Sequence, residues 1–236
     1  MAKLVRLDKF LCDMELGTRS EVKAFLKKGF VTVDGIIEKS PDFKIDPDTH
    51  EIAFQGKVLT YQEFYYYMLH KPAGVITATE DKVQKTVMSF LGEDARKDLF
   101  PVGRLDKDTE GLLLLTNDGE LSHAILSPRK HVPKTYFVEV PEKLDLGQIE
   151  ALEQGVDIGD DKKTIPAKVE IIDDTHIHLT ISEGRYHQVK RMLKAVGSEV
   201  LYLKRISFGA LTLDGSLEKG SYRALTEEEI TALRNK

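Results

Sequence analysis

The sequence GRLDKDTEGLLLLT, residues 103–116, joins a charged loop directly to a run of four leucines. The run is bounded by Gly111 on one side and by the turn signal Asn-Asp-Gly at residues 117–119 on the other. A short, uninterrupted aliphatic run between such breakers predicts a buried strand. A charged loop that leads straight into a rigid strand is a suitable support for catalytic groups.

The composition predicts a protein with a substantial hydrophobic core. Of its 236 residues, 41% are hydrophobic and 31% are charged, a balance typical of soluble proteins. The longest aliphatic run, Leu112 to Leu115, is too short to cross a bilayer, and the first residues lack the apolar stretch of a signal peptide. Cys12 is the only cysteine, which excludes an intrachain disulfide and a multi-cysteine zinc site. We therefore expect a cytoplasmic protein that does not associate with membranes.

Charge is segregated along the chain. The formal net charge is −5, yet residues 1–28 contain seven basic residues against four acids, and residues 185–205 contain six against one. The acids are concentrated elsewhere, for example in residues 157–174. Two basic regions on an acidic body favour a protein that grips RNA in two places. Charge alone leaves a second interpretation open, namely two ordinary solvated helix faces.

Three acids lie in the charged loop: Asp106, Asp108 and Glu110. Carboxylates in a cleft that receives RNA phosphates would repel them, so an acid retained there indicates a chemical role. A calcium-binding loop is one alternative, but the bidentate acid that such a loop requires at its twelfth position is replaced by Asn117. The other alternative is a loop of solvated charges that has no chemical role.

The N-terminal residues predict two short helices. Thr18, followed three residues later by Glu21, is typical of a capping box that opens the second helix, and Gly29 ends it. The first helix is indicated by apolar residues at helical spacing, which are Leu7, Phe10, Leu11 and Met14. Alternating valines then lead into a tight turn at Asp34-Gly35 and a small sheet.

The second helix carries three basic residues in one row. Arg19, Lys23 and Lys27 are spaced by four, so they lie beside the apolar stripe rather than within it. Such a row can contact phosphates without reading sequence. The segments RLDKFL at 6–11, TRSE at 18–21 and GFVTVDG at 29–35 resemble, in order, the S4 RNA-binding domain. The resemblance covers most of residues 1–60.

The second half of the chain resembles pseudouridine synthases of the RsuA/RluA type. Three motifs of that family are matched in family order, namely GRLD at 103–106 with GLLLLTNDG at 111–119, KTY at 134–136, and ISEGRYHQVKRML at 181–193. The resemblance extends from about residue 65 to residue 222. The N-terminal S4 module and the KRML within the third motif point to the RsuA-like branch, which acts on ribosomal RNA.

The resemblance implies roles for three residues. Asp106 is the catalytic aspartate, Tyr136 packs against the reacting base, and Lys190 is the basic residue that pairs with the aspartate, with Arg191 as the alternative. The reaction needs an ionised carboxylate, and a neighbouring cation favours that form. An ordinary core aromatic remains the alternative interpretation of Tyr136, because the residues around it alternate as in a strand.

Further basic and polar residues are candidates for RNA binding because they lie near these motifs or in the S4 row. They are Arg104, Arg129, Lys130, Arg185, His187, Gln188, Arg191, Arg19, Lys23 and Lys27. Pseudouridine formation is an isomerisation without redox change, so we expect neither a cofactor nor a metal. The sequence contains no dinucleotide or phosphate-loop fingerprint, and the His176 and His178 pair lacks a third ligand nearby.

Strand-rich segments separated by individual helices predict an α+β fold rather than a doubly wound parallel sheet. We expect an S4 domain of two helices and a small sheet at residues 1–60. A catalytic domain with a mixed, mostly antiparallel sheet and flanking helices then occupies residues 61–236. Helices are predicted near residues 120–126, 146–154 and 188–195, with a last one from Thr226, and a strand is predicted at residues 64–69.

Two other classes of function remain alternatives. A non-catalytic RNA-binding or ribosome-assembly factor would use the same basic regions, but it would leave the combination of Asp106, Tyr136 and Lys190 unexplained. A hydrolase could use the Asp106 and Asp108 pair, and it would change the mass of its RNA. The expected substrate is a uridine of small-subunit ribosomal RNA, although relatives that act on the large subunit share the motifs. Nothing in the sequence requires more than a monomer.

Overall fold

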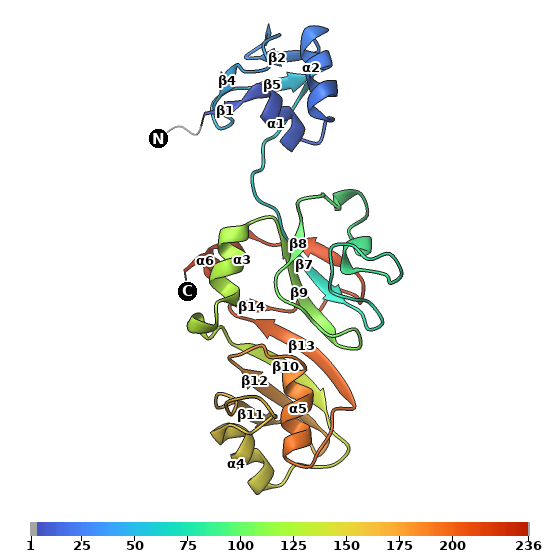
Figure 1. Ribbon diagram of the computed structural model, residues 1–236, viewed down its shortest axis with the longest axis vertical. Helices are drawn as coiled ribbons and strands as arrows, with labels where there is room; N and C mark the ends of the chain where they lie inside the picture. Colours follow the sequence, from blue (N-terminus) through green and yellow to red (C-terminus); the bar gives the residue numbers. More distant parts are fainter. Residues whose placement is uncertain (1–3, 236) are drawn as a thin grey trace. The chain divides into compact units, whose positions relative to one another are not determined.

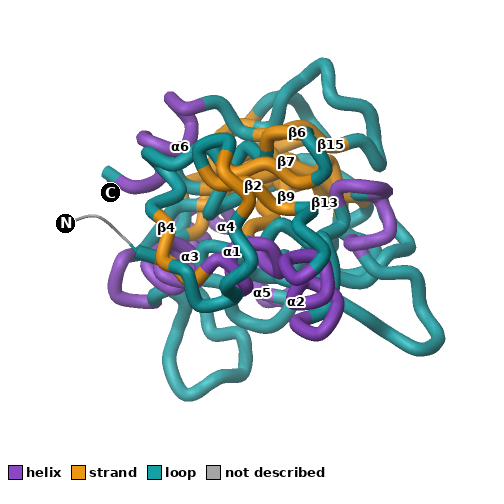
Figure 2. Tube along the Cα trace, turned by 90° about the horizontal axis from the view of Figure 1, so that it is seen from above, coloured by secondary structure: helices purple, strands orange, loops and turns teal. Residues whose placement is uncertain are grey.

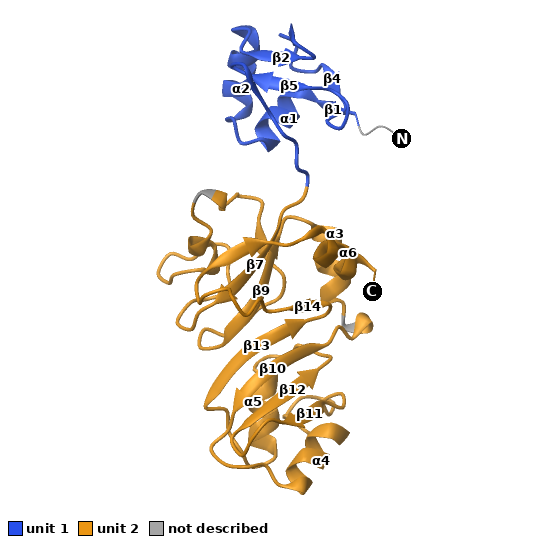
Figure 3. Cartoon of the chain, turned by 180° about the vertical axis from the view of Figure 1, so that it is seen from behind, with its two compact units in different colours: residues 1–63 blue, residues 64–236 orange. Residues whose placement is uncertain are grey.

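The computed structural model describes residues 4–235, which form two compact units that divide between Glu63 and Phe64 (Figure 3). The first unit contains two helices and a small sheet. The second contains a mixed, mostly antiparallel sheet with helices on both faces (Figure 1). The predicted α+β class is therefore confirmed.

The first unit is built from short elements around one core. They are β1 (Val5–Arg6), α1 (Leu7–Asp13), α2 (Arg19–Lys27), β2 (Val31–Val33), β3 (Ile36–Ile37), β4 (Lys44–Ile45), β5 (Ile52–Phe54) and β6 (Lys57–Val58). The predicted capping box at Thr18 and Glu21 is present and begins α2. Asp34 and Gly35 both have positive φ, as a tight hairpin turn between β2 and β3 requires. The apolar stripes of both helices pack against β2 and β5.

The second unit contains a nine-stranded sheet. Its strands are β7 (Tyr66–Lys71), β8 (Phe100–Pro101), β9 (Glu110–Thr116), β10 (Lys134–Glu139), β11 (Lys168–Ile171), β12 (His176–Ile181), β13 (Tyr202–Phe208), β14 (Leu211–Thr212) and β15 (Tyr222–Ala224). The main path runs β11-β12-β10-β13-β9-β7-β15, with β8 paired to β9 and β14 paired to β13. All of these pairs are antiparallel except β9 with β13.

The helices of this unit cover both faces of the sheet. They are η1 (Val87–Phe90), η2 (Gly92–Asp94), α3 (Gly119–Leu126), η3 (Pro128–Lys130), α4 (Leu146–Gln154), α5 (Gln188–Ala195) and α6 (Glu227–Arg234). Helices α5 and α6 lie on opposite faces (Figure 2). Leu113 and Leu115 of β9 pack on the α5 side, whereas Leu112 and Leu114 pack on the α6 side. The uninterrupted leucines are thus explained by burial on both faces.

Three local expectations need correction. The strand predicted at residues 64–69 begins at Tyr66 and runs to Lys71, because its partner β9 ends at Thr116 and the backbone N–H of Tyr65 instead donates to the Asn117 side chain. The turn expected at residues 117–119 is the start of α3, where the Asp118 side chain accepts a hydrogen bond from the backbone of Leu121 at 2.9 Å. The third is Val75 to Thr77, whose β-branched residues predict that the chain returns to a strand; of these residues only Ile76 forms an isolated bridge, to Thr86.

Gly111 is required where β9 meets β13. A Cβ atom at this position would lie 2.2 Å from the backbone oxygen of Arg205, and its φ of +104° is rarely adopted by other residues. The two backbones can therefore approach closely enough to pair only because residue 111 has no side chain. This contact joins the β10 side of the sheet to the β7 side.

The first prediction follows from this contact. Gly111→Ala is expected to lower the free energy of unfolding of the second unit by about 3 kcal/mol, because it combines a backbone clash with a strained φ. Calorimetry of the full chain measures the effect. Gly119→Ala is the matched control, since a Cβ there meets no atom within 4 Å and the residue has no positive φ. Equal stability of the two variants would contradict the role of Gly111.

Candidate active site

The side chain of Lys71 holds the backbone of the loop between β8 and β9. This side chain is 0% exposed at the end of β7, and its ammonium donates to the carbonyls of Asp106 at 3.0 Å, Lys107 at 3.3 Å and Thr109 at 2.8 Å. A fourth acceptor is the carbonyl of Pro72, at 3.1 Å. Burial lowers the pKa of Lys71 to about 8, while the neighbouring loop carboxylates oppose that shift. The loop backbone is therefore fixed by one buried cation.

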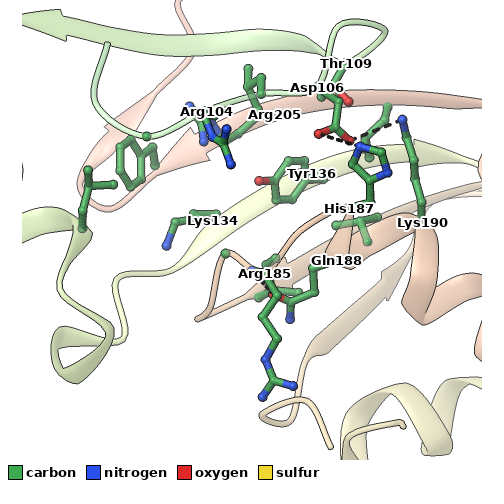
Figure 4. Close-up of a pocket in the computed structure, with 18 residues that line it drawn as sticks. Arg104, Asp106, Thr109, Lys134, Tyr136, Arg185, His187, Gln188, Lys190 and Arg205 are labelled. Atoms are coloured by element: carbon green, nitrogen blue, oxygen red, sulfur yellow. Dashed lines mark hydrogen bonds and ion pairs between the residues drawn. The ribbon is translucent and has the colours of Figure 1, made fainter. Parts of the chain in front are cut away.

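Asp106 projects from this loop toward α5 (Figure 4). Its carboxylate lies 3.4 Å from Nε2 of His187 and 3.4 Å from Nζ of Lys190. The side chain of Asp106 is 29% exposed, so it faces an open site rather than the core. The structure thus brings Asp106 and Lys190, two residues more than eighty positions apart, into one ion pair.

Lys190 is shared with a second acid of the loop. Its ammonium donates to Asp108 at 2.6 Å, and this hydrogen bond holds the pKa of Asp108 below its usual value. Arg191, the sequence alternative to Lys190, lies on another side of α5. Its guanidinium donates to the carbonyl of Ile158 and pairs with Asp160. Of the two cations, Lys190 is the one in contact with Asp106.

Tyr136 lies in a cavity of about 120 Å³ together with these groups. It projects from the middle of β10 and is 8% exposed. Asp106 and Lys190 line the same cavity. Arg205 of β13 also lines it, and Arg205 is the residue that pairs with Tyr136 in the sheet. The aromatic ring, the carboxylate and the cation named from the sequence motifs are therefore gathered around one space (Figure 4).

Two cations of this cavity were not singled out from the sequence. Arg205 is 2% exposed, and its Nε donates to the carbonyl of Leu112 at 2.8 Å, while Nη2 has no partner in the described chain. Burial lowers the pKa of Arg205, and the phenol of Tyr136 opposes the shift. Lys134 has a pKa of about 8, lowered by burial first and by Arg205 second. The sequence feature that could have identified Lys134 is its position two residues before Tyr136, within the KTY motif.

The other basic candidates of the second unit differ in their surroundings. Arg104 is exposed, lines the cavity, and forms no ion pair with any residue that the structure describes. Arg185 also lines it, but its guanidinium donates to the carbonyls of Lys162 at 2.6 Å and Lys163 at 2.9 Å. Gln188 is 4% exposed, and its side chain accepts from the backbone of Arg185, which fixes the start of α5.

The remaining candidates lie away from this cavity. Arg129 and Lys130 are exposed in η3 and are absent from the described residues that line it. Arg19, Lys23 and Lys27 are exposed along α2 in the first unit, as their spacing predicted.

Within residues 4–235 the structure shows no group of three side chains suited to hold a metal ion. His176 lies 2.8 Å from Asp173 and His178 lies 3.9 Å from Glu170, so each histidine has an acidic neighbour of its own. No helix in this part of the chain is long and apolar enough to span a membrane.

Comparison with known families decides the identity. Residues 65–195, more than half of the chain, match the RNA pseudouridylate synthase family. The chain belongs to this family. Residues 5–50 of the synthase match the S4 domain, and the family resemblance stated from the three motifs is confirmed.

The synthase is similar over nearly its whole length to curated proteins. It is 53% identical to the uncharacterized RNA pseudouridine synthase YtzG of Bacillus subtilis, over 97% of this chain and 98% of the relative. It is 44% identical to ribosomal small subunit pseudouridine synthase A of Vibrio cholerae, over 97% of this chain and 99% of that protein. A solved structure described as a pseudouridylate synthase matches with a TM-score of 0.70 and 42% identity, over 97% of this chain and 99% of the other.

The second prediction concerns Lys71. Lys71→Met keeps most of the aliphatic side chain but leaves four buried or partly buried carbonyls without their donor, which is expected to cost about 3 kcal/mol of stability and to abolish uridine conversion. Thermal unfolding and a tritium-release assay on RNA labelled at C5 of uridine measure the two effects. Lys204→Met is the control, because that ammonium lies over the Phe137 ring, 5.6 Å from its centroid, rather than in the loop. Wild-type stability of Lys71→Met would contradict this account.

Proposed function

We propose that this synthase converts one uridine of small-subunit ribosomal RNA to pseudouridine, with Asp106 as its catalytic carboxylate. The observation that carries the proposal is the meeting of Asp106, Lys190 and Tyr136 in one cavity. Relatives from Vibrio cholerae and Escherichia coli that are 44% identical to this chain are named ribosomal small subunit pseudouridine synthase A, which supports the choice of RNA.

The reaction breaks the bond between N1 of uracil and C1′, turns the base, and joins C5 to C1′. The proton on C5 is lost and N1 gains one, so the product is an isomer and no electrons are transferred. Asp106 either attacks C1′ or removes the C2′ proton, and both routes require its ionised form. The Lys190 ammonium at 3.4 Å favours that form in a site that is surrounded by RNA phosphates during catalysis.

Tyr136 and the neighbouring cations act on the detached base. The tyrosine ring supplies a flat surface for uracil while the base is free to turn, and its hydroxyl assists the loss of the C5 proton. The uridine reaches this cavity only after leaving its stack in the RNA, at a cost of about a few kcal/mol. Arg104, exposed at the rim, is suited to hold the phosphate of the flipped nucleotide.

The third prediction concerns Asp106. Asp106→Asn removes the carboxylate with little change of shape, and conversion is expected to fall by at least about 10³-fold. Carbodiimide primer extension detects pseudouridine in ribosomal RNA that has been incubated with the protein, both as naked RNA and within assembling small subunits. Wild-type protein should produce a new stop at one small-subunit uridine, whereas the variant should produce none.

Asp108→Asn is the matched control, because it makes the same change two residues away on a side chain that is 72% exposed. It should retain conversion within about tenfold, since Lys190 can still pair with Asp106. RNA mass is measured in parallel, because an isomerisation leaves it unchanged while a hydrolase adds water. Absence of any new stop with the wild-type protein would refute the proposed activity.

The fourth prediction concerns the basic row of the S4 unit. Replacing Arg19, Lys23 and Lys27 together by alanine is expected to weaken RNA binding and to reduce the slope of log affinity against log salt by about two to three, because up to three phosphate contacts are lost. Conversion at saturating enzyme should be preserved. The control is Lys39, Lys44 and Lys57 replaced together, which removes three exposed charges of the same unit outside α2. An equal effect of both triple changes would exclude a specific role for the row.

A further inference from the structure

A stacked pair of rings beside Asp106 is not used in the proposed chemistry. Tyr186 is 70% exposed, and its ring lies 3.8 Å from that of His187, centroid to centroid, at an angle of 18°. His187 in turn contacts Asp106 at 3.4 Å. The pair therefore extends from the catalytic carboxylate to the surface, with the phenol ring as its outermost member.

The backbone that carries the pair is held by hydrogen bonds and not by burial. The carbonyl of Tyr186 accepts a hydrogen bond from Arg191 at 3.0 Å, and Arg191 is itself anchored to Ile158 and Asp160. His187 has the left-handed conformation, with φ of 48° and ψ of 36°, at the residue that precedes α5. Such strain in a residue other than glycine persists only where the structure enforces it, and it often occurs at functional sites. The backbone that carries the exposed ring is thus held in one place, and the ring itself rests on His187.

Tyr186 faces a second space next to the one that contains Tyr136. This cleft has a volume of about 520 Å³ and is lined by both rings of the pair. It shares the segment from Gly103 to Asp106, and also His187, with the cavity of the catalytic groups. The two spaces therefore lie on either side of shared residues, so a ligand of two nucleotides can reach from the first to the second.

The chemistry of the second cleft matches a nucleotide. A flat aromatic surface binds the face of a base, with a free energy worth about 1–3 kcal/mol per stacked base. Arg104, which lines both spaces, supplies a cation for the phosphate between them. Flipping a uridine deprives its neighbour in the strand of a stacking partner, so a ring beside the catalytic cavity replaces the lost contact.

We propose that Tyr186, supported by His187, is a stacking subsite for the nucleobase adjacent to the target uridine. This assignment rests on the proposed function, because the uridine site in the first cavity defines which nucleotide is the neighbour. The subsite accepts any base, since stacking does not require a specific hydrogen-bonding edge.

Binding of small fragments to the full-length protein tests the subsite without any need for catalysis. The probes are uridine monophosphate, the dinucleotides UpA and ApU, and matched compounds in which adenine is replaced by an abasic ribose. NMR titration gives the affinities and shows which tyrosine rings shift, with Tyr136→Phe and Tyr186→Phe spectra used for assignment. At least one dinucleotide should bind about tenfold more tightly than its abasic counterpart and shift the Tyr186 ring signals.

Variants separate stacking from structure. Tyr186→Ala should remove the tenfold gain while leaving the affinity for uridine monophosphate unchanged, and Tyr186→Phe should keep the gain because it keeps the ring. Leu201→Ala is the control for losing an exposed apolar side chain elsewhere, since Leu201 is 55% exposed. The proposal is overturned if adenine adds no affinity, or if Tyr186→Ala keeps the gain. Fragments that never shift Tyr136 would instead contradict the uridine site of the proposed function.

Discussion

The active site depends on one buried ammonium group. Lys71 ends a strand whose register with β9 pairs it with Gly111, and from there its side chain donates to carbonyls on both sides of Asp108. Four carbonyls pointing at one atom form a polar centre that would be costly to bury without a cation. Because the loop backbone is tied inward, the side chain of Asp106 is directed outward to α5. Sheet register thus sets the position of the carboxylate.

The two halves of the sheet that provides this register are joined by one parallel strand pair, β9 with β13. Gly111 and Arg205 meet there, and the same two strands supply the end of the loop that carries Asp106 and the buried guanidinium of the cavity. Arg205 is retained in the interior although no carboxylate pairs with it among the described residues. A buried unpaired cation destabilises a protein, which is consistent with a function for it at Tyr136. The junction of the sheet therefore lies beside the candidate active site.

Local signals in the sequence were sufficient for many of the helices and strands, whereas the candidate site residues came from the resemblance to a family. The capping pattern at Thr18 and the helix from Gln188 to Ala195 are determined by neighbours within a few positions, and the structure has both as predicted. The roles of Lys71 and Arg205 could not be read in this way. Each depends on partners about 35 to 95 residues distant that only the sheet brings together, and a buried lysine or arginine has no local sequence signature.

The division of Lys190 between two acids has a chemical consequence. The ammonium is closer to Asp108, at 2.6 Å, than to Asp106, at 3.4 Å, and Asp108 is absent from the described residues that line the cavity with Tyr136. In the proposed reaction, a carboxylate held in a full, short ion pair would be a weaker nucleophile and a weaker base, because the ammonium would engage its lone pairs. The longer contact therefore leaves the oxygens of Asp106 better able to take the role proposed for them. Asp108 thus helps to hold Lys190 at the loop, while Asp106 is the acid that lines the cavity.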